Sequence, residues 1–297
     1  MFGSARKRTK LQSAMEYLMT YGWAILIIAV VLGALFQLGV FNSSSFSPRA
    51  PPGACQVFRP SGPGTTTNIN LMGVCTGQLP QYVAVFGTTA TSTTASTSSM
   101  MNALAAGATF SAWINYRGTI YGCNGISGIT NNSNSQWRMG LIGGCNSRAP
   151  YFITEHNIWP NEVAASTSNL QTNRWYHVVG TWNGTSLRVS FFVNGALNNS
   201  AIASNGIGGY TSWYITLGGY CSGCGAFNGS VANIQIYDTS FSANDIQALY
   251  AKGIGGAPAK LQNLVGWWPL NGNSNDYSGN NNNGVPTAVT FTSQYGK

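Results

Sequence analysis

Acidic side chains are scarce in this chain, and their spacing does not suit acid–base catalysis. Hydrolysis of a glycosidic bond requires two carboxyl groups about 5 to 10 Å apart, one on each side of the bond. No Glu-x-Asp-x-x-Glu pattern occurs, in which the first two acids would project from the same face of a strand. Glu155 and Glu162 lie seven residues apart in a region with loop composition, and Asp245 is explained as a helix cap. The other acids after the N-terminal region are Asp238 and Asp276. We therefore predict that the chain is not an enzyme.

The histidines and cysteines are spaced for packing and disulfides rather than for a nucleophile or a metal. His177 lies between Tyr176 and Val178 in a run with strand composition, where a packed histidine is commoner than a general base. Zinc sites need close cysteine pairs or a histidine pair at ligand spacing. This chain has one Cys-x-x-Cys, and its two histidines, His156 and His177, are isolated. Disulfides are therefore favoured over zinc.

All six cysteines follow the apolar N-terminal segment, and an even number is typical of an oxidising compartment. Six cysteines allow 15 pairings, and the sequence does not choose among them. Three sequence-local couples would each close a loop: Cys55 with Cys75, Cys123 with Cys145, and Cys221 with Cys224.

The positive charge is not distributed as in a nucleic-acid-binding protein. The formal charge is +8, and four of these charges are Arg6, Lys7, Arg8 and Lys10, before the apolar segment. The remaining charge is spread thinly. A nucleic-acid site gathers basic residues on one face or interleaves them with aromatic residues. We expect no nucleic-acid partner.

Residues 17–41 form an uncharged apolar segment. As a helix it is roughly 37 Å long, at about 1.5 Å per residue, which is enough to span a bilayer. A cleaved secretory signal has a shorter apolar core and a small-x-small cleavage site, and the chain has neither. Basic residues precede the segment and the next one is Arg49. The positive-inside rule then predicts a single-pass protein with a cytoplasmic N-terminus and an extracellular C-terminal domain.

The residues just before this segment carry a family resemblance. Gln12 and Glu16 follow a basic run at a spacing that resembles the class III signal of archaeal type IV pilins. The resemblance implies that residues 1–11 are a leader that a prepilin peptidase removes before Gln12, and that residues 12–41 are a pilin-like helix. It also implies that this helix packs against like subunits in a filament, with Glu16 meeting the free amine of a neighbour. Leu11 departs from the family, which usually has a small residue there, and a plain membrane anchor is the alternative.

Three segments after the helix are rich in turn-forming or polar residues. Residues 42–54 contain three prolines and are predicted to be a linker. Residues 55–75 contain prolines and glycines and are predicted to be an irregular lobe closed by its own disulfide. The Ser- and Thr-rich run that starts at Thr88 is expected to be an exposed loop or a poorly regular strand edge.

The remainder of the chain has the composition of a β protein, with one helix predicted at residues 243–252. Ser242 would cap that helix, with Asp245 three residues later and Gly253 just beyond its end. Seven aromatic or β-branched runs bounded by Gly and Asn are predicted to be strands. They begin at Tyr82, Phe110, Trp137, Arg174, Ser186, Ser212 and Gly229.

Five elements resemble, in order and spacing, the concanavalin A-like, laminin-G-type jellyroll over residues 82–253. They are residues 110–114, 175–182, 193–195 and 227–238, and the helix from Ser242 to Tyr250. The resemblance implies a mainly β antiparallel sandwich of two facing sheets, occupying residues 55–297. Residues 264–272 and 276–284 resemble the family's opening strand and loop, although here they come last. Circular permutation is preferred to a truncated second copy, because about 30 residues are too few for another core. A strand from Val289 would then be an edge partner.

The same resemblance implies a head that binds glycans, through aromatic rings stacked on sugars and sometimes a calcium ion at the rim. Trp159, beside Pro160 in a polar loop, is the predicted sugar-stacking residue. The other tryptophans considered are expected in the core: Trp113, Trp137, Trp175, Trp182 and Trp213. The candidate calcium ligands, for which Asx-turn chemistry is an alternative explanation, are Asp276, Ser278 and Asn280.

Five Asn-x-Ser/Thr sequons lie in the part predicted to be outside the cell, at Asn42, Asn131, Asn183, Asn198 and Asn228. We therefore expect an archaeal pilin-like surface protein or adhesin, located in the cell membrane or a surface filament and carrying a lectin-like head. A non-polymerising anchored lectin is the first alternative, and a glycoside hydrolase is the second.

Overall fold

The computed structural model describes residues 8–37, 55–58, 66–69, 80–87, 92–96, 101–118, 123–130, 137–145, 147–154, 162–204, 206, 214–218 and 227–293. These belong to two compact units, Met1–Pro48 and Arg49–Lys297, which are taken one at a time.

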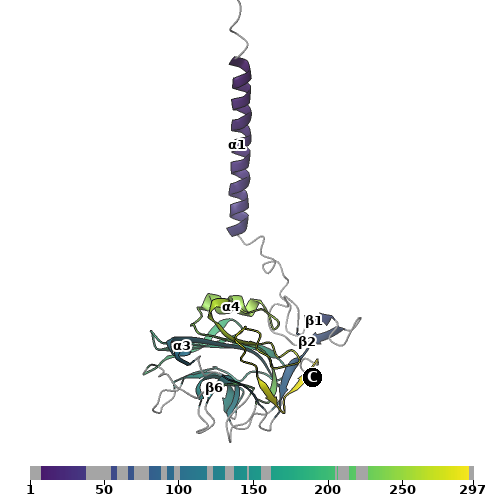
Figure 1. The fold of residues 1–297 in the computed structure, drawn as a ribbon, viewed down its shortest axis with the longest axis vertical. Helices are drawn as coiled ribbons and strands as arrows, with labels where there is room; N and C mark the ends of the chain where they lie inside the picture. Colours follow the sequence, from purple (N-terminus) through teal and green to yellow (C-terminus); the bar gives the residue numbers. More distant parts are fainter. Residues whose placement is uncertain are drawn as a thin grey trace, which may run out of the picture. The chain divides into compact units, whose positions relative to one another are not determined.

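The first unit contains one helix, α1 (Arg8–Gln37), which appears in purple in Figure 1. The segment holds no proline, and its apolar residues continue round the helix without a polar face. Residues 21–34 are all exposed, with Trp23 and Ile25 about two-thirds so. A helix is thus confirmed in this segment, and it begins at Arg8 within the basic leader, whereas its pilin-like role stays a prediction. In the described part of the chain, no helix meets the length and apolarity needed to cross a membrane.

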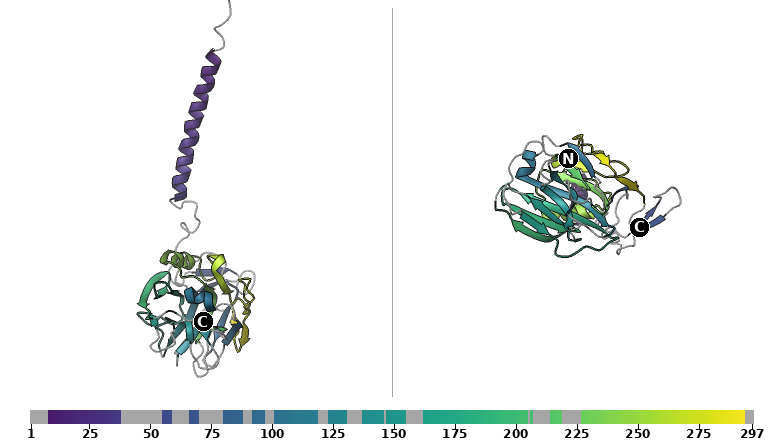
Figure 2. Two further views of the ribbon diagram at one scale, coloured as in Figure 1. Left: turned by 60° about the vertical axis from the view of Figure 1, so that its left-hand side comes forward. Right: turned by 90° about the horizontal axis from the view of Figure 1, so that it is seen from below.

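The second unit is the head, an antiparallel sandwich of two sheets (Figures 1 and 2). Within the described residues, sheet 1 has the order β12-β11-β10-β5-β14-β3-β17, with β15 also paired to β14. Its strands are β3 (Val83–Phe86), β5 (Gly107–Tyr116), β10 (Trp175–Asn183), β11 (Arg188–Val193), β12 (Ala196–Ile202), β14 (Gly229–Tyr237), β15 (Leu264–Trp268) and β17 (Thr290–Thr292). This mainly β architecture was predicted from the strand runs.

Sheet 2 faces sheet 1 and has the order β16-β4-β13-β6-β7-β8-β9 over the same described ranges. Its strands are β4 (Ser92–Ser96), β6 (Cys123–Thr130), β7 (Trp137–Cys145), β8 (Tyr151–Thr154), β9 (Glu162–Ala165), β13 (Tyr214–Leu217) and β16 (Val285–Thr287). Alternation along each strand sends one set of side chains between the sheets. In β5, for example, Phe110 and Ile114 join the common core, whereas Ser111 and Trp113 point to the outer face.

The outer face of sheet 1 is covered in part by α4 (Ala243–Ala251), which lies over the sheet in Figure 1. Ile246 and Leu249 of this helix pack in a cluster with Val179, Phe192 and Tyr237 of the sheet. The predicted capping box is present, because the Ser242 hydroxyl accepts from the Asp245 N–H and the Asp245 carboxylate accepts from the Ser242 N–H. Local sequence and apolar burial therefore agree on this helix.

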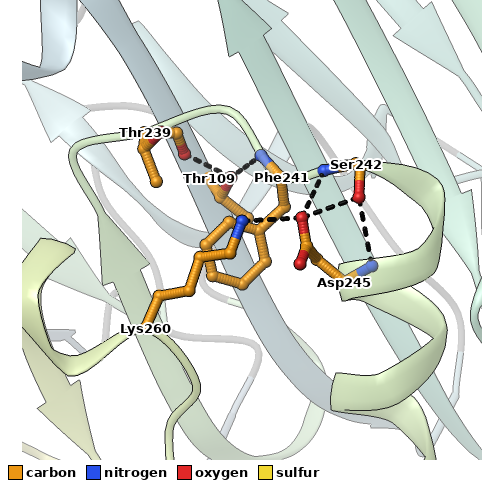
Figure 3. A network of polar contacts seen from close by, with 6 residues as sticks. All are labelled: Thr109, Thr239, Phe241, Ser242, Asp245 and Lys260. Atoms are coloured by element: carbon orange, nitrogen blue, oxygen red, sulfur yellow. Dashed lines mark hydrogen bonds and ion pairs between the residues drawn. The ribbon is translucent and has the colours of Figure 1, made fainter.

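A group of polar contacts, which we call the α4 clasp, holds the start of this helix (Figure 3). Asp245 Oδ2 accepts from Lys260 Nζ at 2.7 Å and from Ser242 Oγ at 2.7 Å. The Lys260 ammonium also lies 4.8 Å from the centre of the Phe241 ring. Thr109 Oγ1 donates to the Thr239 carbonyl and accepts from the Phe241 N–H, which ties the clasp to β5.

The C-terminal strands complete this sandwich instead of starting another one. β15 pairs with β14 and β17 pairs with β3 in sheet 1, while β16 pairs with β4 in sheet 2. The edge-strand prediction for the segment from Val289 is confirmed. These yellow strands lie within the head in Figure 2. A truncated second copy is not needed to explain them.

In three places the structure differs from the local predictions, because short polar or turn-rich runs pair with another strand. The lobe predicted to be irregular contains a two-stranded sheet, β1 (Cys55–Phe58) with β2 (Thr66–Ile69). The Ser- and Thr-rich run, expected to be an exposed loop or a poorly regular strand edge, contains the strand β4, which pairs on both sides and so is not an edge. A short helix, α3 (Met101–Ala106), follows it. Glu162, expected in a loop, begins β9 opposite Thr154.

Candidate functional site

A pocket of about 320 Å³ opens where the middle of β14 lies beside the end of β15, against the segments that follow β15 and α4. We call it the corner pocket. It lies on the helix-covered side of sheet 1, because Trp267 packs against the cluster under α4 while its neighbour Trp268 points into the core. Its described lining residues are Pro80, Asn233, Ile254, Gly255, Trp267, Pro269, Asn271 and Tyr277.

Two aromatic rings form a corner in this pocket. The Trp267 and Tyr277 rings lie 6.2 Å apart between centroids and are inclined by 65°. Tyr277 is 54% exposed, and Trp267 is partly exposed. Two accessible rings with this inclination offer apolar faces in two directions. Either face can stack on a flat apolar surface, such as one face of a sugar ring.

Asn233 lies at the back of the pocket because a β-bulge places it there. The pairing of β14 with β5 shifts between Ala232 and Gln235, and Asn233 takes the left-handed conformation with φ of 51°. Asparagine tolerates this conformation better than most residues. Its N–H donates to the carbonyl of Pro269, which directly follows β15 on the other side of β14. The irregular strand thus turns an amide side chain toward the pocket.

A chain of hydrogen bonds fixes the Asn233 side chain. Its Oδ1 accepts from Trp267 Nε1 at 2.7 Å and from Gln235 Nε2 at 2.9 Å, and its Nδ2 donates to the Gly256 carbonyl. Gln235 in turn accepts from the Tyr237 hydroxyl, whose pKa is raised well above its usual value by burial. Trp267 therefore presents an oriented ring with its N–H already bonded.

Residues 276–282, which we call the Asp276 turn, include the pocket residue Tyr277 and are held by side-chain hydrogen bonds. Asp276 Oδ1 accepts from the backbone N–H groups of Trp267 and Ser278, and Oδ2 accepts from Ser278 Oγ and the Asn282 N–H. A carboxylate has about four acceptor positions, so these donors occupy all of them. Nδ2 of Asn280 donates to the carbonyls of residues 264 and 265. These contacts match the Asx-turn alternative for Asp276, Ser278 and Asn280.

A second aromatic cluster on the outer face of sheet 1 is covered, and we call it the covered patch. It consists of Ser111, Trp113, His177 and Tyr250, and Trp113 and His177 are each only 1% exposed. Tyr250 of α4 lies over the other rings, 5.7 Å from Trp113 and 5.8 Å from His177 between centroids. His177 Nε2 lies 2.9 Å from Ser111 Oγ, and its Nδ1 has no hydrogen-bond partner.

This histidine does not suit acid–base chemistry, although it touches a serine. Burial lowers the pKa of His177 to about 3, so that the imidazole is neutral near neutral pH. The helix above it keeps Ser111 buried as well. The expectation that His177 is a packed residue is confirmed.

The other acids do not converge in the part of the chain that the structure describes. No group of three His, Cys, Asp or Glu side chains is arranged there for a metal. Their positions differ: Asp245 lies in the α4 clasp, Asp276 in its turn, Asp238 accepts from Asn263, Glu162 begins β9, and Glu155 lies outside the described residues.

Residues 86–247 match the profile of the concanavalin A-like lectin/glucanases superfamily, which covers more than half of the chain. The chain belongs to this superfamily. The predicted resemblance to the fold is thereby confirmed over nearly the expected range. A comparison with curated proteins gave no match.

Several solved structures are similar to this chain at low sequence identity, and the first of them has a TM-score above 0.5. A Bacteroides ovatus protein named for carbohydrate binding has a TM-score of 0.53 and 16% identity, over 77% of this chain and 66% of that one. A heptameric pentraxin of Limulus polyphemus has a TM-score of 0.45 and 11% identity, over 74% and 91%. Domain 4 of a Geobacillus stearothermophilus arabinanase, solved with arabinotriose, has 0.45 and 14%, over 65% and 86%. The chain thus spans just under two-thirds of the first of these proteins.

The predicted sugar-stacking residue of the lectin-like head, Trp159, lies outside the described residues. Among the tryptophans expected in the core, Trp113, Trp175 and Trp182 are buried as predicted. The residues that line the corner pocket were missed, although one signal was present. Adjacent strand residues point to opposite faces, so the Trp267–Trp268 pair required one ring to face outward.

The cysteine predictions remain predictions. In the described backbone, Cys123 lies directly opposite Cys145 on neighbouring strands β6 and β7. Opposed antiparallel residues have Cα atoms about 4.5 to 5.5 Å apart, within the range of disulfides. The backbone is therefore compatible with the 123–145 couple. Cys75, Cys221 and Cys224 lie outside the described residues, as does the Cys55 side chain.

The described sequons differ in the contacts that their residues make. Asn183 is the last residue of β10, and its Oδ1 accepts from the N–H groups of Thr185 and Ser186 in the turn that follows. Both Asn198 side-chain atoms bond to Thr167. Asn228 precedes the fully buried Ser230. Asn183, Asn198 and Asn228 are all half-buried, while Asn42 and Asn131 lie outside the described residues, so glycosylation stays a prediction.

The processing and assembly residues Leu11, Gln12 and Glu16 fall within the backbone of α1, and their side chains lie outside what the structure describes.

Proposed function

We propose that the chain is a cell-surface protein that binds glycans through the corner pocket of its lectin-like head. The arrangement of Trp267 and Tyr277 around the amides of Asn233 and Asn271 carries this proposal. Sugars combine apolar ring faces with many hydroxyl groups, so they suit exposed aromatic rings beside neutral amides. Membership in a superfamily of lectins and glucanases is consistent with that chemistry.

The binding test is a glycan array probed with the full chain, solubilised in a zwitterionic detergent that carries no sugar. We expect selective binding that Tyr277→Ala reduces. Leu197→Ala is the matched control, because Leu197 is 57% exposed on β12 at the opposite edge of sheet 1. An array with no selective signal would overturn the proposal.

We propose that the head binds sugars without cleaving them. The described lining of the corner pocket contains no carboxyl side chain, whereas glycoside hydrolysis uses two. Prolonged incubation of the full chain with a bound oligosaccharide should therefore leave the oligosaccharide intact by mass spectrometry. Shortened products that disappear in Glu155→Gln or Glu162→Gln would revive the hydrolase alternative.

The exposed apolar surface of α1 supports a role in anchoring or assembly. An apolar helix surface is costly in water, and a bilayer or a bundle of identical helices would cover it. We propose that the helix joins a filament of like subunits after a prepilin peptidase cleaves before Gln12. An archaeal membrane and surface filament are the proposed location. A non-polymerising membrane anchor is the alternative.

The mature N-terminus separates these two alternatives. Mass spectrometry of protein recovered from an archaeal host should show the loss of residues 1–11, and an intact leader would sink the pilin proposal. Glu16→Ala should then reduce filament assembly without reducing membrane insertion, because the carboxylate would pair with a neighbour's amine. Glu16→Gln distinguishes loss of charge from loss of size. Normal filaments from both variants would exclude the charge-pairing role.

A further inference from the structure

The corner pocket offers neutral groups only, and this limits the kind of sugar it can hold. None of its described lining residues carries a charge. A charged ligand that loses its water needs an opposite charge or several hydrogen bonds in return. The lining supplies no such charge, so carboxylated sugars would pay a desolvation cost that neutral sugars avoid.

The charged groups that lie nearest in sequence to the lining are already engaged. The Asp276 carboxylate, which precedes the pocket residue Tyr277, accepts four hydrogen bonds, from Trp267, Ser278 and Asn282. Lys252, two residues before Ile254, donates through Nζ to the carbonyls of residues 257 and 258, both at 3.1 Å. Lys260 is paired with Asp245 at 2.7 Å. These groups are thus held by contacts within the chain.

The hydrogen-bonding capacity that is left consists of neutral donors. Asn271 uses Oδ1 to accept from the Tyr82 N–H at 2.8 Å, and its Nδ2 has no partner within the described structure. Asn233 Nδ2 uses one of its two hydrogens on the Gly256 carbonyl. The Tyr277 hydroxyl accepts from Asn273 and keeps its own hydrogen. Hydroxyl and acetamido oxygens of a sugar are suitable acceptors for these groups.

The volume also favours a small unit. Pockets for drug-sized molecules range from about 300 to 1,000 Å³, and the corner pocket, at about 320 Å³, is at the lower end. One sugar residue can occupy it with a ring face on Tyr277 or Trp267, while the rest of a glycan extends into solvent.

From these contacts we infer that the corner pocket holds a neutral hexose or N-acetylhexosamine unit and needs no metal ion. The inference rests on the proposed glycan binding and adds the sugar class and the independence from calcium. It also separates this pocket from the calcium-dependent rim site that the sequence suggested at Asp276.

The test is a titration of the detergent-solubilised full chain with matched oligosaccharides, followed by calorimetry. Each neutral oligosaccharide is compared with its counterpart bearing a terminal uronic or sialic acid, with and without EDTA. We expect EDTA to leave the affinity unchanged, and the anionic counterpart to bind at least about tenfold more weakly, which corresponds to about 1.4 kcal/mol. Tyr277→Ala should weaken neutral binding by about fivefold, and Leu197→Ala should not.

The outcomes separate the inference from the proposal on which it rests. Equal or tighter binding of the anionic sugar, or loss of binding in EDTA, overturns the inference while glycan binding stands. Neutral binding that Tyr277→Ala and Asn271→Ala both leave unchanged also overturns it, because the sugar would then lie elsewhere. If neither neutral nor anionic sugars bind, the proposed function itself fails. A thermal melt of each variant shows whether a loss of binding reflects a loss of folding.

Discussion

The covered patch and the corner pocket contain similar side chains on the same face of one sheet, yet they differ in how much of their aromatic rings is exposed. The covered patch stacks Trp113 and His177 under Tyr250 of α4, and both are almost fully buried. The corner pocket sets Trp267 against Tyr277 with half of the tyrosine surface exposed. Residue type alone therefore does not distinguish a packed cluster from a binding site.

The difference arises from the elements that lie over each cluster. The α4 clasp fixes the start of the helix, and the helix then closes the covered patch. The bulge at Asn233 and the Asp276 turn leave the corner pocket open instead. They hold the Trp267 and Tyr277 rings apart at the edge of the same face. Changes in the covered patch should alter stability, whereas changes in the corner pocket should alter binding.

The largest effect is expected for Trp113→Ala. Removing a fully buried indole leaves a cavity, and such substitutions cost about 3 to 5 kcal/mol. Chemical denaturation of the full chain in detergent, followed by near-ultraviolet circular dichroism of the head, measures this free energy of unfolding. A loss below about 1 kcal/mol would mean that α4 does not hold the covered patch closed.

The next effect is the pH dependence that His177 contributes. Its pKa is about 3 in the folded head, against 6.5 ordinarily, so the unfolded chain binds more protons between these values. Stability is then fully present above pH 6.5 and is lost as the pH falls, by about 2 kcal/mol between pH 6.5 and about 4.5. Thermal melts across this range should show a smaller decline in His177→Gln. His156→Gln is the matched control, and identical declines in all three proteins would contradict the assignment.

A moderate loss is expected for Asp245→Asn in the α4 clasp. The substitution removes an ion pair with partly exposed groups and weakens the capping box, which together cost about 1 to 2 kcal/mol. Burial raises the pKa of Asp245, but hydrogen bonds from Lys260 and Ser242 outweigh it and lower the pKa below the ordinary value. This contribution is therefore present at neutral pH and lost as the pH falls below the usual aspartate range. A wild-type denaturation midpoint for the variant at pH 7 would show that the clasp does not stabilise α4.

The smallest effect on stability is expected for Tyr277→Ala, which should lower the free energy of unfolding by less than about 0.5 kcal/mol. The ring is more than half exposed, and its loss should instead weaken sugar binding. Denaturation and calorimetry on the same preparation separate the two quantities. If Tyr277→Ala lost stability and kept its affinity for sugar, the corner pocket would be a packed cluster like the covered patch, and the proposed contrast would be wrong.

Strands that form because of their own residue composition were predicted from the sequence. Strands that form because a neighbouring strand offers a pairing edge were missed. Runs rich in Trp, Tyr, Val and Ile gave β5, β10, β11 and β14, because these residues suit a pleated, half-buried surface. β6 and β12, rich in Gly, Asn and Ala, were missed, since their pairing depends on an edge supplied by another strand. The capping box predicted α4 to within a residue.

The corner pocket was less predictable because it depends on geometry that strand alternation does not encode. Alternation required Trp267 or Trp268 to face outward, but not which loops would surround it. The left-handed Asn233 at the bulge brings an amide into the pocket, and no local pattern marks that bulge. The carboxylate oxygens of Asp276 could bind either a metal or backbone N–H groups. In the structure the surrounding backbone directs its N–H groups at them.

The central claim, that the open cluster binds sugar and the covered one does not, is tested most directly by hydrogen–deuterium exchange of the full chain with and without a bound neutral oligosaccharide. We predict slower exchange in residues 269–280 and unchanged exchange in β5 and β10 under α4. Protection confined to other segments of the chain, with residues 269–280 unaffected at saturating sugar, would contradict the account.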